Sequence, residues 1–127
     1  MRGQRGSVSL TVAALSVLAL VLAMGVADIG EVLLARSRAR AAADTAALAA
    51  AQELAFATGV EPAAVAADYA ARNGAELTSC VCAVGSFEAA VMVTVEVADL
   101  LLLPGPVSVP AQARAVVDLP SPSPAPA

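Results

Sequence analysis

The chain has 127 residues, a formal net charge of -4 at pH 7 and a mean hydropathy of +0.79, and 59% of its residues are hydrophobic. With two Phe, one Tyr and no Trp, it lacks the aromatic side chains that fill an ordinary globular core, so only a small folded domain is available. All eleven Asp and Glu residues follow the apolar N-terminal run, from Asp28 onward. This acidic balance argues against a nucleic-acid partner.

The first predicted element is a membrane-spanning helix at residues 8–27. The run contains no charged residue, and at ~1.5 Å rise per residue it spans about 30 Å, the thickness of the hydrocarbon core of a bilayer. Two arginines precede it in the segment 1–7, which predicts a cytoplasmic leader and an extracytoplasmic remainder, with membrane lipid around the helix. Arg36, Arg38 and Arg40 beyond the helix weaken this charge argument.

A removed export signal is the second interpretation of the same run. Gly25, Val26 and Ala27 provide small residues at a suitable spacing for cleavage before Asp28. The apolar stretch is longer than the ~7–15 residues of an ordinary signal, which favours a retained anchor.

Residues 28–57 are predicted to extend the same helix, because this alanine-rich segment contains no Pro. Its small residues recur at helical three- and four-residue steps, which permits close approach of another helix. The predicted helix-packing interface for partner subunits consists of Ala39, Ala43, Ala46 and Ala50. The alternative is that alanine is merely abundant in this chain and the stripe is accidental.

A short second helix is predicted to open a small extracytoplasmic α+β domain at residues 58–119. Pro62 is placed for the first helical turn, and Asn73 followed by Gly74 for a C-terminal stop.

The segment 86–100 is predicted to contain a β-strand, because its apolar residues alternate with others in steps of two. Segments 76–83 and 111–119 are its expected partners, which gives an antiparallel sheet of about three strands and the fold class α+β, with a pilin-like plan. The valine face of the sheet is expected to be covered by one of two helices. The candidates are the short helix near Tyr69 and the outer half of the long helix, near Leu48, Leu54 and Phe56. That face consists of Val91, Val93, Val95 and Val97.

The composition of two further segments indicates their environment. The leucine run at residues 100–103 is expected to pack in the core, with contact to the membrane surface as the alternative. Residues 120–127 form a Pro-rich tail that is expected to be disordered.

Two segments resemble a known family. QRGSVSL followed at once by an uncharged helix, and ARSRARAAADTAALAAAQ just beyond it, are similar to the TadE-like and TadG-like proteins of tight-adherence (Flp-type) pilus and secretion systems, in their compact actinobacterial form. The similarity extends loosely to about Leu119. The resemblance implies a minor pilin or pseudopilin whose partners are other pilus or secretion subunits.

The resemblance also implies a processing site. In this family a prepilin-type peptidase cuts after a Gly that follows basic residues, and here Gly6 and Ser7 occupy those positions. The major pilins and TadE-type pseudopilins usually carry Glu five residues into the mature chain, whereas this sequence has Thr11. Cleavage after Gly6 and retention as a plain anchor therefore both remain open.

Cys80 and Cys82 are the one conspicuous chemical pair. At i,i+2 on a strand they project from the same face, with Cα atoms near the upper limit for a disulfide, so buried thiols and a disulfide are both open. The sequence has no His, and the pair alone is too small a ligand set for a metal. The sequence shows neither a phosphate-binding loop nor a nucleophile-base set, so we expect no enzyme, no cofactor and no small-molecule substrate.

Three functions follow from these observations. The first is a pilin-like envelope protein, single-pass in the cell membrane or at the cell surface after processing, that assembles into a Tad/Flp-type pilus or secretion apparatus through helix packing. The second is a permanently anchored scaffold or adaptor of that machinery. The third is a small secreted protein cleaved before Asp28.

Overall fold

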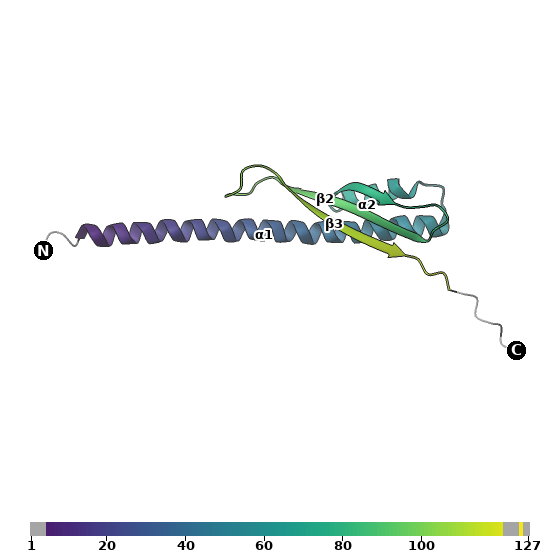
Figure 1. Cartoon of the computed structure of the whole chain (residues 1–127), viewed down its shortest axis with the longest axis horizontal. Coiled ribbons are helices and arrows are strands. Elements are labelled where there is room, and N and C mark those ends of the chain that lie inside the picture. The colour runs from purple at the N-terminus through teal and green to yellow at the C-terminus, as the bar shows by residue number, and fades with distance from the viewer. Residues whose placement is uncertain (1–4, 121–124, 126–127) are drawn as a thin grey trace.

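The computed structural model describes residues 5–120 and 125. In chain order the described residues form α1 (Arg5–Phe56), α2 (Pro62–Arg72), β1 (Glu76–Val81), β2 (Glu88–Val97) and β3 (Val107–Val116). The strands make an antiparallel sheet in the order β1-β2-β3, which lies along the C-terminal half of α1 while the N-terminal half projects alone (Figure 1). The predicted α+β fold class is confirmed. Most of the predicted leader 1–7 and of the predicted tail 120–127 lies outside the described residues.

Helix α1 is one continuous helix of 52 residues, about 80 Å long at ~1.5 Å per residue. Its abundant alanine favours the helix, and Gly30 in its interior does not interrupt it. The helix ends where Ala57 adopts a left-handed backbone with φ 43°. There the Glu53 carboxylate accepts hydrogen bonds from the backbone N–H of Thr58, at 2.7 Å, and from its hydroxyl.

Helix α2 matches the predicted short helix. Pro62 occupies its first turn. Proline is favourable there because backbone N–H groups in the first turn have no acceptor within the helix, so the N–H that proline lacks is not needed. Ala66 and Ala70 are fully buried and face α1. On its exposed side Arg72 pairs with Asp68 at 2.8 Å, one turn apart.

Strand β2 lies at the centre of the sheet and alternates strictly between its two faces. Its residues that turn toward α1 are buried, whereas Met92 and Thr94 on the opposite face are half-buried and Glu96 is exposed. The predicted valine face is confirmed with a small change, since Val97 is only half-buried. The buried residues are Ala89, Val91, Val93 and Val95.

Three strand boundaries differ from those predicted. Strand β1 ends at Val81 rather than at residue 83, before the turn to β2. Strand β3 begins at Val107 rather than at residue 111 and ends at Val116 rather than at residue 119. Pro110 lies inside β3, opposite Thr94. Pro cannot donate a ladder hydrogen bond, but β3 is an edge strand, where Pro is tolerated.

The core is a thin layer of small side chains between α1 and the sheet. Helix α1 contributes alanines between positions 35 and 51, and β2 contributes the valines. Of the two predicted covers, the outer half of α1 is the one that lies on the sheet, while α2 packs on α1 and contacts β1. Of the three residues named for that half, Leu54 packs against the core. Leu48 and Phe56 are 51% and 69% exposed and are not part of it.

Candidate functional site

The N-terminal half of α1 is uncovered in the described chain. Its apolar side chains are exposed, among them Leu10 at 75%, Leu15 at 64% and Leu22 at 61%. By length and composition, α1 is the one helix of the described residues that could cross a membrane, and none of its qualifying apolar window is buried. Apolar surface exposed to water costs about 25 cal/mol per Å², so a surface of this extent requires a lipid or protein environment.

Two hydroxyl groups in this half, those of Thr11 and Ser16, have hydrogen-bond partners within the helix itself. The Thr11 hydroxyl donates to the carbonyl oxygens of Ser7, at 2.7 Å, and Val8, at 3.0 Å. The Ser16 hydroxyl donates to the carbonyl oxygen of Val12 at 2.9 Å. Because each donor is satisfied locally, these residues are compatible with hydrocarbon around the helix.

The predicted processing residues lie at the free end of α1. Gly6 and Ser7 are exposed in its first turn, and a Cβ added at Gly6 would meet no other atom within 4 Å. Thr11, the fifth residue after the Gly6–Ser7 bond, is one turn further along.

The predicted helix-packing alanines lie inside this chain's own core. Ala39, Ala43, Ala46 and Ala50 are all 0% exposed. They belong to the part of α1 that packs against α2, β2 and β3. Their small size does bring a helix close to its neighbours, but the neighbours are elements of the same chain, and no surface of these four residues is left for another subunit.

A contact that the sequence did not predict joins the end of the apolar segment to the folded domain. Asp28, one residue beyond the predicted span, is 7% exposed. Its two carboxylate oxygens accept hydrogen bonds from the backbone N–H groups of Leu101, at 2.7 Å, and Leu102, at 2.8 Å. Asp28 therefore fixes the loop between β2 and β3 to α1. The only sequence signal is an acidic residue directly after an apolar run, and it does not indicate a partner for the carboxylate.

The leucines of that loop are not in the core, so the expectation of core packing was wrong. Leu101 is 59% exposed, Leu102 47% and Leu103 56%. The loop is held by its backbone, and Leu102 reaches over Gly25, where its Cδ1 would lie 3.7 Å from an added Cβ.

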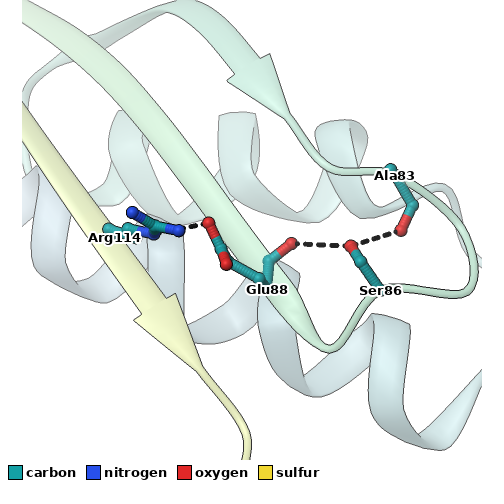
Figure 2. Close-up of polar contacts among 4 residues, drawn as sticks. All are labelled: Ala83, Ser86, Glu88 and Arg114. Atoms are coloured by element: carbon teal, nitrogen blue, oxygen red, sulfur yellow. Dashed lines mark hydrogen bonds and ion pairs between the residues drawn. The ribbon is translucent and has the colours of Figure 1, made fainter.

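A second polar contact lies on the outer face of the sheet. The Glu88 carboxylate on β2 pairs with the Arg114 guanidinium on β3, and the Ser86 hydroxyl in the preceding turn donates to the carbonyl oxygens of Ala83 and Glu88 (Figure 2). The hydrogen bond and the positive charge of Arg114 lower the pKa of Glu88. The hydrogen bond from the Thr58 hydroxyl likewise lowers the pKa of Glu53 at the end of α1.

A disulfide joins Cys80 and Cys82, whose Cα atoms are 5.5 Å apart. This distance lies within the usual range for disulfides. The sequence argument placed both cysteines on a fully extended strand, but β1 ends at Val81 and Cys82 lies beyond it. Within residues 5–120 and 125, no group of three or more His, Cys, Asp or Glu side chains is placed to hold a metal ion.

The fold defines a class of protein: a small α+β domain on the outer half of one long helix, whose other half is apolar, uncovered and suited to a membrane anchor. Residues 6–53, most of that helix, match the family model described as putative Flp pilus-assembly TadE/G-like. The resemblance to TadE/G-like proteins seen in the sequence is thus confirmed over residues 6–53. No curated protein and no solved structure matches the chain.

Proposed function

We propose that this protein is a pilin-like envelope component of a Tad/Flp-type pilus or secretion apparatus. Residues 8–27 cross the cell membrane with the N-terminus in the cytoplasm, and the α+β domain is displayed on the outer side.

The division of α1 into two halves is the observation that carries this proposal. The TadE/G-like match includes both halves of α1. In the apolar N-terminal half the side chains are exposed, whereas the alanine-rich C-terminal half is buried against the domain. A helix of this kind can be held by lipid before assembly and by neighbouring apolar helices after it, because both environments remove the same side chains from water.

The surface that meets other subunits is assigned to the uncovered half of α1 rather than to its alanines. Site-specific photocrosslinking in the native host tests this assignment. A photoreactive residue at Leu15 is expected to crosslink to other pilus or secretion subunits. One at Leu119, a half-exposed residue after β3, serves as the control. Equal crosslinking from both positions would refute a specific role for the apolar half.

Cleavage after Gly6 by a prepilin-type peptidase is part of the same proposal. Both residues of the bond are exposed at the end of α1, and the Gly6→Leu variant is expected to retain the leader. Gly30→Leu is the matched control, because Gly30 is also a helical glycine with no atom near its Cβ position. An identical mature mass for Gly6→Leu and the parent protein would refute processing at this site.

A permanently anchored scaffold or adaptor of the same machinery is the second candidate, and Thr11 favours it. A charged residue in an apolar helix needs a partner from another subunit, whereas the Thr11 hydroxyl is already satisfied by carbonyl groups of its own helix. Replacement of Thr11 by Val is therefore expected to leave assembly intact; loss of assembly would reveal an intermolecular role.

A further inference from the structure

The loop between β2 and β3 lies against α1 where the apolar segment ends. Both oxygens of the Asp28 carboxylate hold its backbone, at Leu101 and Leu102. Leu102 also lies over Gly25, which belongs to the last turn of the segment 8–27. In Figure 1 this loop extends beyond the sheet toward the N-terminal half of α1.

The loop presents apolar side chains that the domain does not cover. Leu101, Leu102 and Leu103 each expose about half of their surface, at 59%, 47% and 56%. Val26 and Ile29, on the neighbouring stretch of α1, are 70% and 61% exposed. Because Leu102 lies over Gly25 within the apolar segment, the leucines adjoin the uncovered apolar part of α1 rather than forming an isolated patch.

The hydrogen bonds to Asp28 suit a position at the edge of the hydrocarbon region. Irregular backbone is tolerated there only where its polar groups are paired, and the carboxylate pairs two consecutive N–H groups of the loop. The same two donors compensate the carboxylate, whose charge would otherwise be unfavourable at that depth.

We propose that residues 100–103 form a second membrane contact, in which the leucines insert at the boundary between lipid headgroups and acyl chains of the outer leaflet. The inference rests on the proposed crossing of the membrane by residues 8–27, because continuity with that segment sets the depth of the loop. With two points of attachment, α1 and the loop, the domain is fixed in height and in rotation about the helix axis.

Tryptophan fluorescence in vesicles tests the proposal, because the chain contains no Trp of its own. Single Trp residues are introduced as Leu101→Trp in the loop, Leu15→Trp in the apolar half of α1, and Val84→Trp. Val84 is 91% exposed in the turn at the opposite end of β2, so it serves as the aqueous control. The full-length variants are reconstituted at low protein density into phosphatidylcholine and phosphatidylglycerol vesicles that contain lipids brominated near the headgroup end or deep in the acyl chain.

The proposal expects a distinct quenching pattern at each site. Leu101→Trp should lose most fluorescence with the shallow bromines, Leu15→Trp with the deep bromines, and Val84→Trp with neither. In the Leu101→Trp background, Asp28→Ala should weaken the shallow quenching, because the loop is then released from α1.

The opposite outcomes separate the two proposals. If Leu15→Trp is quenched but Leu101→Trp resembles Val84→Trp, the loop contact is refuted and the membrane span stands. If Leu15→Trp is not quenched, the span itself is refuted, and the loop contact with it. If the Trp of Leu101→Trp is removed from water only at high protein density, the leucines contact a second copy of the chain rather than lipid, and the proposal is also overturned. Unchanged quenching after Asp28→Ala would refute the role of that residue.

Discussion

Asp28 and Leu102 are 74 positions apart in the sequence, yet the backbone N–H of Leu102 donates a hydrogen bond of 2.8 Å to the Asp28 carboxylate. The other carboxylate oxygen accepts the N–H of Leu101, so one side chain on α1 holds two consecutive residues of the β2–β3 loop. This contact is the link between the apolar half of α1 and the folded domain.

Removal of that carboxylate is expected to loosen the loop. Asp28→Ala leaves two part-buried N–H groups without their acceptor, at a cost of about 1–3 kcal/mol in the free energy of unfolding. Urea denaturation in detergent micelles and hydrogen exchange of residues 98–106 measure the effect. The control is Glu31→Ala, which removes an exposed carboxylate one turn away. Equal stability of the two variants would contradict the structural role of Asp28.

Larger side chains on the alanine face are expected to destabilise the domain itself. Ala46 has no exposed surface, and Ala46→Leu overfills the space between α1 and its neighbours, at about 1–3 kcal/mol or more. Ala41→Leu on the exposed side of the same helix should leave the melting temperature nearly unchanged. If Ala46→Leu is as stable as Ala41→Leu but fails to bind partner subunits, the alanines are an external interface after all.

Features that depend on neighbouring residues in the sequence were predicted, whereas contacts between residues far apart in the sequence were not. The long helix, the turn at Pro62 and the alternation of β2 are local patterns, and each was predicted from consecutive residues. The sequence also predicted a close-packing alanine face, but a helical stripe does not specify whether its partner lies in the same chain or in another. The contact of Asp28 with Leu102 was not predictable, because it depends on backbone N–H groups, which every loop residue has.

The ends of the strands were also predicted wrongly, because they too depend on which elements lie side by side in the fold. The third strand was predicted to begin at residue 111, directly after Pro110, whereas Pro110 lies within β3. An edge strand tolerates Pro, because one of its two sides has no neighbouring strand that needs an N–H. The sequence alone does not indicate which strand lies at an edge.

The end of α1 offers a stabilising substitution. Ala57 adopts a φ of 43°, a left-handed conformation that is unfavourable for residues with a Cβ and that glycine adopts readily. Ala57→Gly is expected to raise the free energy of unfolding by about 0.5–1 kcal/mol. Thermal unfolding checks the direction, with Ala55→Gly, inside the helix, as a control that should be destabilising. A lower melting temperature for Ala57→Gly would refute the left-handed helix end.

The Glu88–Arg114 pair predicts a dependence of stability on pH. The pKa of Glu88 is lower in the folded chain because of its hydrogen bond to Arg114, so this contribution is present above the ordinary carboxyl pKa of about 4.3 and is lost as the pH falls through the folded value. Glu88→Gln should flatten this acid-side decline in melting temperature. The comparison is Glu96→Gln, an exposed glutamate on the same strand, and identical pH profiles for the two variants would contradict the pairing.

The Cys80–Cys82 disulfide closes a very short loop. In the chain-entropy account such a bond restricts the unfolded chain little, so reduction should cost only about 1–2 kcal/mol and leave the sheet intact. Alkylation with and without reductant, followed by intact mass, measures the oxidation state. Alkylation of both thiols in untreated protein from its native host would show that the bond is absent there.

The account depends most on whether residues 8–27 stay with the domain, and the mature N-terminus of the native protein tests this directly. Intact mass and N-terminal sequence are measured on the protein recovered from membrane, sheared-surface and medium fractions of its host. The account predicts a start at or before Ser7, in the membrane or the sheared-surface fraction, so that the apolar half of α1 is retained. A start at Asp28, with the protein in the medium, would contradict it and identify the apolar run as a removed signal.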